Sequence, residues 1–92
     1  QKTALVANSN GFTAYPNPTA GYVTIEQTFD VASKGTIDVL DINGRVLYTE
    51  KVDLNEGAFN YTVNLSNLPN GLYLVRLSSE REFFTERVQI IK

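Results

Sequence analysis

The sequence predicts an all-β fold, an immunoglobulin-like antiparallel β-sandwich of about seven strands. Two observations indicate this fold class. Apolar and polar residues alternate with a period of two along most of the chain, as in strands that bury one face and leave the other in water. Turn-forming residues interrupt these runs about every 8 to 12 residues, a spacing typical of sandwiches and barrels. No useful run has helical periodicity, and segment 65–68, which Pro69 stops, is expected to make a single turn.

The alternation assigns the strands and their buried faces. Val23 and Ile25 share the buried face of one strand, and Tyr73, Val75 and Leu77 share that of another. The runs at 59–65 and 84–90 are read in the same way. The strands are expected at residues 12–15, 21–28, 35–42, 45–52, 58–65, 71–78 and 83–91.

Two local signals refine the third and fourth strands. The adjacent apolar residues Val39 and Leu40 predict a central strand or a small β-bulge. Asn43 and Gly44 follow directly, and this pair favours the two positive-φ positions of a two-residue type I′ turn. We therefore expect residues 36–42 to pair with residues 45–52 as a hairpin.

A tyrosine corner is expected at the start of the sixth strand. Gly71 precedes Tyr73 by two residues, just after the turn at Pro69. In such a corner the ring packs into the core and its hydroxyl binds backbone upstream. This arrangement supports the immunoglobulin-like reading.

The chain divides into a short linker and one domain. Residues 1–14 are small and polar and are expected to form a linker, with an additional edge strand at Leu5 and Val6 as the alternative. Residues 15–92 form the domain. The chain opens on Gln1 rather than Met, so we expect a piece of a longer protein. It contains neither a signal peptide nor an apolar run long enough to span a bilayer, so we expect no membrane insertion.

The composition excludes several chemistries. The 92 residues include no Cys, His, Met or Trp, so thiolate nucleophiles, imidazole bases and zinc–sulfur sites are absent. A net charge of −2 with scattered basic residues gives no footprint for nucleic acid. We expect no enzymatic activity and no cofactor. The carboxylates that could form an acid–base pair lie mostly in or near turns and are expected on a solvated face; they are Glu50, Asp53, Glu56, Glu80, Glu82 and Glu86.

Two binding alternatives remain. Asp38, Asp41 and the stretch 53–57 resemble fragments of calcium loops but lack a dense carboxylate series, so no metal is expected. Outward aromatic residues, Tyr22 with either Phe83 or Phe84, would suit a sugar-binding face. On that alternative the chain is a non-catalytic accessory module, carbohydrate-binding or spacer, of a secreted hydrolase.

The last strand offers a further surface. Residues 86–92 end the sequence without a polar tail. They are expected to complete the sandwich and also to present an accessible strand edge and terminal carboxylate to a partner, which would bind by strand addition.

Four stretches in order resemble one protein family. They are the opening 15–25 with Tyr15-Pro-Asn-Pro, the hairpin 39–46 with Asp41 and Gly44, the strand 68–77 with Gly71 and Tyr73, and the closing 87–92. The sequence is similar in these stretches to the type A C-terminal sorting domain of the type IX secretion system, found in Bacteroidota-type bacteria.

The resemblance implies a secretion signal rather than a catalyst. Such a domain follows a cargo fused on its N-terminal side, is exported to the periplasm, and is recognised by the outer-membrane type IX secretion machinery. A C-terminal signal peptidase, which can act as a sortase, then usually removes it within or before residues 1–14 and can attach the cargo to the cell surface. The cargo is therefore secreted or cell-surface.

The resemblance also assigns roles to residues. The closing strand is the part expected to be recognised by the machinery: Val88, Gln89, Ile90, Ile91 and Lys92. The other motif residues are expected to act mainly in the structure: Pro16, Asn17, Pro18, Gly21, Asp41, Asn43, Gly44, Gly71 and Tyr73.

Overall fold

Within residues 12–92 the structure has seven strands, and each overlaps a strand that the sequence predicted. The protein is described by a computed structural model over residues 12–92. Most of the linker, including the alternative edge strand at Leu5 and Val6, lies outside the described residues. The strands are β1 (Thr13–Tyr15), β2 (Tyr22–Phe29), β3 (Ser33–Leu40), β4 (Val46–Leu54), β5 (Gly57–Asn64), β6 (Gly71–Ser78) and β7 (Phe83–Ile90).

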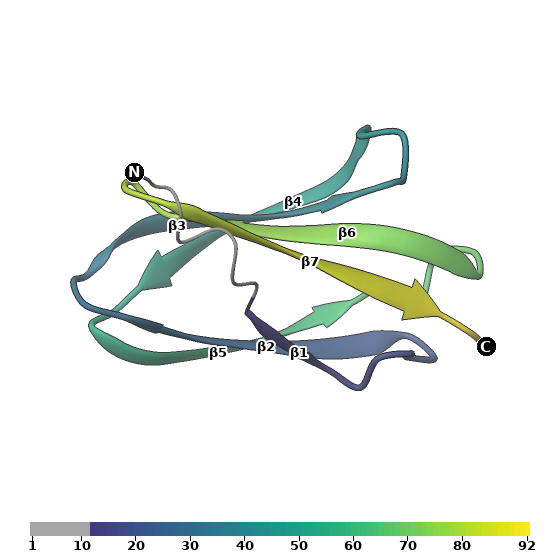
Figure 1. Ribbon diagram of the computed structural model, residues 1–92, viewed down its shortest axis with the longest axis horizontal. Coiled ribbons are helices and arrows are strands. Elements are labelled where there is room, and N and C mark those ends of the chain that lie inside the picture. The colour runs from purple at the N-terminus through teal and green to yellow at the C-terminus, as the bar shows by residue number, and fades with distance from the viewer. Residues whose placement is uncertain (1–11) are drawn as a thin grey trace.

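The strands build two antiparallel sheets that face each other (Figure 1). One sheet has the order β1-β2-β5 and the other the order β4-β3-β6-β7. The predicted all-β, immunoglobulin-like sandwich is confirmed. β7 is therefore an edge strand, and it pairs along its whole length with β6, from Gly71 opposite Ile90 to Ser78 opposite Phe83. Within residues 12–92 no helix is long and apolar enough to cross a membrane.

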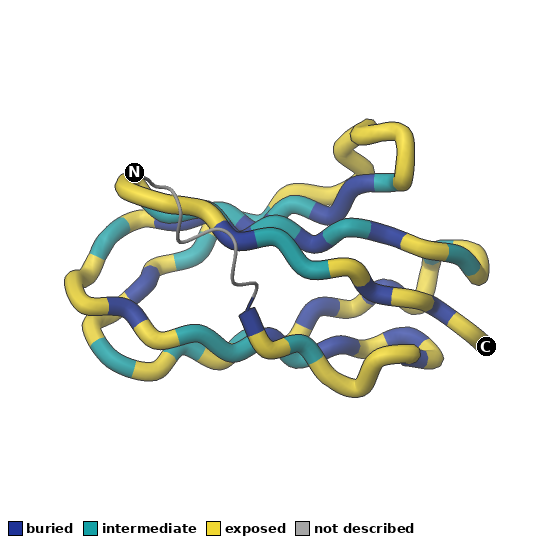
Figure 2. The backbone as a smooth tube through the Cα atoms, viewed as in Figure 1, coloured by how far each residue is buried: buried dark blue, intermediate teal, exposed yellow. Residues whose placement is uncertain are grey.

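The core lies between the sheets and consists of the alternating apolar residues. Figure 2 shows buried positions recurring along both layers where they face each other. Val23 and Ile25 from β2 meet Val75 and Leu77 from β6 in one buried cluster. Phe29 adds edge-to-face contacts with Phe59 and Phe84, with ring centroids 6.2 and 6.1 Å apart. Each fully buried aliphatic side chain contributes about 1.5–3 kcal/mol, so this cluster is the main source of stability.

The β3–β4 hairpin has the predicted strands but a different turn. β3 is central, and its pairing with β4 shifts between Val39 and Leu40, which confirms the bulge. The Gly44 N–H donates to the Asp41 carbonyl at 3.0 Å, and the Asp41 N–H donates to the Arg45 carbonyl at 3.0 Å. The central residues of the turn are thus Ile42 and Asn43, followed by Gly44 at φ 90°. The predicted two-residue type I′ turn is wrong: the loop has three residues, a length whose third position favours a left-handed glycine.

Candidate functional site

The residues expected to be recognised lie at the end of β7 and just beyond it. Val88 and Ile90 are 0% and 1% exposed and belong to the core, so neither side chain is accessible in the folded domain. Gln89, Ile91 and Lys92 are exposed. The alternation along β7 thus divides the predicted segment into an anchoring half and an accessible half.

The opening motif closes the free edge of β7. We call residues 16–20, between β1 and β2, the strap. The Asn17 side chain imitates a paired peptide group: its Nδ2 donates to the Arg87 carbonyl at 2.9 Å, and its Oδ1 accepts from the Gln89 N–H at 3.0 Å. Thr19 continues the pairing through its backbone. Its N–H donates to the Gln89 carbonyl, and its carbonyl accepts from the Ile91 N–H, both at 2.9 Å.

This arrangement corrects one expectation. The edge of the last strand is not accessible over residues 87–91, because the strap occupies its hydrogen-bonding groups. The strap runs parallel to β7, with Thr19 opposite Ile90. An uncovered edge is a template for unwanted strand pairing, so the strap protects the folded domain from such association.

The strap itself is held by short-range contacts. Thr19 is 3% exposed, and its hydroxyl donates to the Tyr22 carbonyl and accepts from the Gly21 N–H. Gly21 packs closely against Ser66: a Cβ there would lie 3.1 Å from the Cβ of Ser66, which is tighter than an ordinary van der Waals contact. Pro16 and Pro18 flank Asn17 and follow cis peptide bonds. Pro16, Asn17 and Pro18 thus lie within the strap, and Gly21 follows it directly.

Lys92 anchors the end of the chain to the turn between β5 and β6. Its Nζ donates to the Ser66 carbonyl at 2.8 Å, and its N–H donates to the Asn70 Oδ1 at 3.1 Å. The strap contacts β7 on the opposite edge from β6. The strap and the end of β7 thus meet at one end of the sandwich, where Figure 1 places the C-terminus next to the turn that leads into β2.

The tyrosine corner is present in the same region. Tyr73 is 8% exposed, and its hydroxyl donates to the Pro69 carbonyl at 2.8 Å. A Cβ at Gly71 would lie 3.7 Å from the Tyr73 ring, an ordinary van der Waals contact, so Gly71 lies against the ring. Tyr73 pairs with Val88 on β7. The corner thereby fixes the position of β6, the strand with which β7 pairs.

The Asp41 carboxylate stabilises the separate β3–β4 hairpin. Its Oδ1 accepts from the backbone N–H groups of Asn43 at 2.9 Å and Arg45 at 3.0 Å. These hydrogen bonds lower the pKa of Asp41 below its usual value, and the bond from the Arg45 N–H has the largest effect. Desolvation of the carboxylate acts in the opposite direction. Asp41 and Asn43 therefore have a structural role in the turn.

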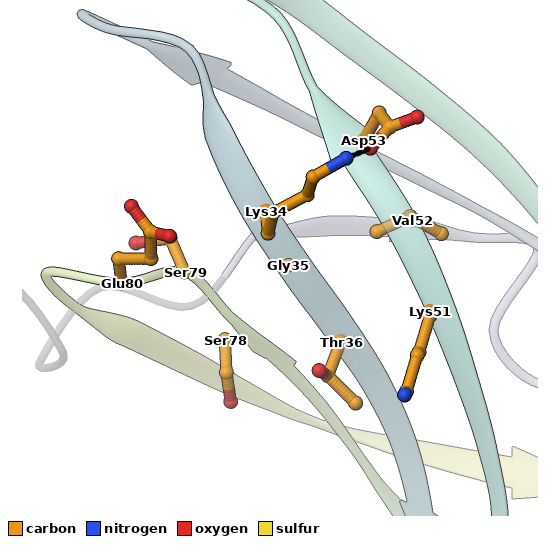
Figure 3. A pocket seen from close by; sticks show the side chains of 9 residues that line it. All are labelled: Lys34, Gly35, Thr36, Lys51, Val52, Asp53, Ser78, Ser79 and Glu80. Atoms are coloured by element: carbon orange, nitrogen blue, oxygen red, sulfur yellow. Dashed lines mark hydrogen bonds and ion pairs between the residues drawn. The ribbon is translucent and has the colours of Figure 1, made fainter.

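A surface hollow of about 670 Å³ lies over the ends of β3, β4 and β6 (Figure 3). Lys34 and Asp53 meet across it, with the Nζ–Oδ1 distance 2.8 Å and side chains 80% and 74% exposed. The hydrogen bond to Asp53 is the main cause that raises the pKa of Lys34. Glu80 approaches from the opposite loop. Such exposed, mutually neutralising charges are typical of a solvated face, and the hollow supplies no argument for catalysis.

Asp38 and Asp41, which were considered for calcium, both have protein partners. Asp38 accepts from the Thr49 hydroxyl at 2.8 Å and from the Arg76 guanidinium at 3.0 Å. Asp41 accepts the two amide bonds described above. Within residues 12–92 no group of three or more acidic residues is placed to hold a metal ion.

The aromatic residues considered for a sugar-binding face do not gather. Phe84 is buried, whereas Tyr22 and Phe83 are 59% and 49% exposed. They lie on different sheets. Tyr22 follows the strap beside the end of β7, and Phe83 begins β7 at the other end. These two rings cannot stack on one sugar.

Sequence reasoning missed the partners of the last strand. Thr19, Ser66 and Asn70 hold β7 or Lys92, and none was singled out. The one available signal was Asn17 between two prolines. Because prolines have no N–H, such a segment cannot form a regular ladder, and a carboxamide can supply both a donor and an acceptor instead.

Comparison with protein families identifies the class. The model of the secretion system C-terminal sorting domain matches residues 13–92, beginning where β1 begins. The match covers nearly the whole chain, and the chain belongs to this family. It is a C-terminal sorting signal for type IX secretion, and its cargo lies on its N-terminal side and is secreted or cell-surface. No curated protein matches the sequence significantly.

Proposed function

We propose that the outer-membrane secretion machinery recognises this domain at the end of β7, through the accessible side chains Gln89, Ile91 and Lys92. The observation that carries the proposal is the division of the segment: Val88 and Ile90 are buried, and the residues between and after them are exposed. The core, the tyrosine corner and the strap then serve to hold these three side chains in one arrangement. Pre-organisation of this kind lowers the entropic cost of binding.

The test is a secreted reporter fused to the N-terminal side of the 92-residue chain, in a bacterium that has a type IX system. The triple variant Gln89→Ala, Ile91→Ser, Lys92→Gln changes exposed side chains, and the one structural contact it removes is the hydrogen bond from Lys92 Nζ to the Ser66 carbonyl. We expect at least a tenfold loss of reporter outside the cell. The matched control is Asn60→Ala with Thr62→Ala, two exposed positions on β5, which should leave export unchanged.

Each outcome is interpretable if the melting temperatures of the variants are measured beside export. Export that persists in a folded triple variant would show that the machinery binds elsewhere on the domain. Export that persists after removal of residues 12–92 would overturn the sorting function for this chain. Simple deletion of residues 88–92 is less informative, because it also removes Val88 and Ile90 from the core.

We further propose that the route passes through the periplasm and that a C-terminal signal peptidase or sortase removes the domain, with attachment of the cargo to the cell surface. Support comes from the start of the folded unit: Phe12 is 5% exposed within the core, and Thr13–Tyr15 pairs with β2. We therefore expect the cut before Phe12. Mass spectrometry of the released cargo should find its last residue within 1–11; a terminus inside β1 or β2 would contradict this.

A further inference from the structure

We infer that a second copy of this chain binds at the free edge of β4, so that two copies form a symmetric dimer with one continuous sheet. β4 is an edge strand and pairs only with β3. The opposite edge of the same sheet, at β7, is covered by the strap. Within residues 12–92 no such segment lies along β4. An uncovered strand edge is a template for a further strand.

The edge of β4 is long and carries exposed apolar side chains. β4 has nine residues, more than any other strand of the described domain. Val46, Leu47 and Tyr48 follow one another and are 47%, 36% and 40% exposed. Figure 1 shows the tip of the β3–β4 hairpin raised above the rest of the sandwich. Three consecutive exposed apolar residues are unusual on a strand that faces only water, so this edge favours a protein partner.

The charges of β4 indicate a second copy as that partner. Two antiparallel copies related by a twofold axis through Thr49 place Arg45 of each copy opposite Asp53 of the other. These side chains are 78% and 74% exposed, so each can meet a further charge. The bulge in the β3–β4 pairing adds twist at the hairpin end, which the long Arg45 side chain can span. Opposite charges that face each other across two strands stabilise the pairing.

The same charges disfavour the neighbouring registers. Side chains opposed across an antiparallel pair lie on the same face, so a twofold axis must pass through a residue rather than between two. An axis through Tyr48 would oppose Arg45 to Lys51, and axes through Glu50 or Lys51 would oppose each of these residues to its own copy. Like charges directly opposite each other are destabilising. Axes nearer either end of β4 pair only a short part of the strand, so the axis through Thr49 is the favoured one.

The dimer leaves the rest of the domain accessible. The two four-stranded sheets become one, with a β7 strand at each outer edge. The chain enters the described domain at β1, which contacts β7 and not the edge at β4. A cargo on the N-terminal side therefore does not have to pass the dimer contact. The inference is independent of the proposed function, because it concerns a different edge of the sheet.

The first experiment uses an introduced thiol, since the chain has no cysteine of its own. In the inferred register the two Thr49 Cα atoms lie about 4.5–5.5 Å apart, a distance that a disulfide can span. Lys51→Cys is the matched control on the same strand, because its two copies would lie at least about 13 Å apart. Both positions are exposed, so neither substitution should prevent folding of the 92-residue chain.

Under mild oxidation, Thr49→Cys should form a covalent dimer at least about tenfold faster than Lys51→Cys. Equal rates, or a faster reaction of Lys51→Cys, would overturn the inferred register. Melting temperatures of the reduced variants, measured beside the reaction, establish that both proteins are folded when they are compared.

The second experiment reverses the charges and measures molar mass by analytical ultracentrifugation. The mass of the wild-type chain should rise from 10.2 kDa toward twice that value as the concentration approaches about 1 mM. Arg45→Asp and Asp53→Arg should each weaken association at least about tenfold, and the double reversal should restore it to within about threefold. Glu82→Arg, an exposed change of the same charge in the turn before β7, should leave association unchanged.

Two results would contradict the dimer. One is a wild-type chain that stays monomeric at every concentration, and the other is a double reversal that associates no better than the single reversals. An equal mixture of Arg45→Asp and Asp53→Arg should associate as the wild type does, because each variant then supplies the charge that the other lacks. These measurements require no secretion, so the outcome of the export experiment does not affect them.

Discussion

The Tyr73 hydroxyl donates a hydrogen bond of 2.8 Å to the carbonyl of Pro69, four residues upstream, while its ring packs in the core. The bond ties the start of β6 to the preceding turn. β6 lies between β3 and β7, so the position of the terminal strand depends on this contact.

Replacement Tyr73→Phe should lower the free energy of unfolding by about 1 kcal/mol, the net value of one such hydrogen bond. Urea denaturation measures it. Tyr48→Phe is the matched control, because the Tyr48 hydroxyl bonds Glu50 at an exposed site and its loss should cost under about 0.5 kcal/mol. Equal effects of the two substitutions would show that the corner does not stabilise the domain.

Two adjacent isoleucines near the end of the chain should respond in opposite ways. Ile90 is 1% exposed and Ile91 is 51% exposed. Ile90→Ala should destabilise the domain by about 2–5 kcal/mol, through lost burial and a cavity, whereas Ile91→Ala should change stability by under about 0.5 kcal/mol. Thermal and urea unfolding of both variants give the comparison. A large loss in Ile91→Ala would place that side chain in the core as well.

Gly35 on β3 should tolerate no side chain. A Cβ there would lie 2.5 Å from Cδ1 of Leu54 and 2.8 Å from the carbonyl oxygen of Ser78. The leucine can rotate, but the carbonyl belongs to the neighbouring strand, so Gly35→Ala should cost about 1–3 kcal/mol. Lys34→Ala, one residue away, removes only an exposed ion pair and serves as the control. Wild-type stability in Gly35→Ala would mean that β3 and β6 can separate without cost.

Acidification should loosen the hairpin at Asp41. Its pKa is lowered in the folded state, chiefly by the Arg45 N–H, so the carboxylate stabilises the turn above the unfolded pKa of about 3.9. This contribution is lost as the pH falls through the folded pKa. The amide NMR signals of Asn43 and Arg45 should titrate with a midpoint below about 3.9. Asp41→Asn should abolish the titration; a midpoint at or above the unfolded value would contradict the assignment.

The strands were predictable because their signal is local. The alternation through Val23 and Ile25, or through Val75 and Leu77, marks a buried face wherever the partner strand lies, and each of these residues is buried. The hairpin pairing was equally local. The type of turn could not be predicted locally, because an Asn-Gly pair suits both a two-residue loop and a longer one. The choice between them depends on Asp41, whose carboxylate accepts hydrogen bonds from the N–H groups of Asn43 and Arg45.

The candidate site was predictable only in part. Its position at the last strand followed from the motif order, but the burial of Val88 and Ile90 divides the segment, and the edge was expected to be free. Asn17 bonds Arg87 across 70 positions and Gln89 across 72. The hydrophobic periodicity of the sequence cannot predict contacts between residues so far apart, since these contacts form only when the two sheets have assembled.

The long sequence separation between Asn17 and its partners on β7 has a consequence for synthesis of the protein on the ribosome. The strap leaves the ribosome long before β7, and domains fold as their parts become available. Until β7 follows, Asn17 lacks its partners Arg87 and Gln89, β6 has only one of its two neighbouring strands, and the core lacks Val88 and Ile90. A polypeptide that stops short of β7 never completes the domain. The sorting signal is therefore complete only when translation has passed through the entire cargo, and a truncated cargo protein lacks a functional signal for export.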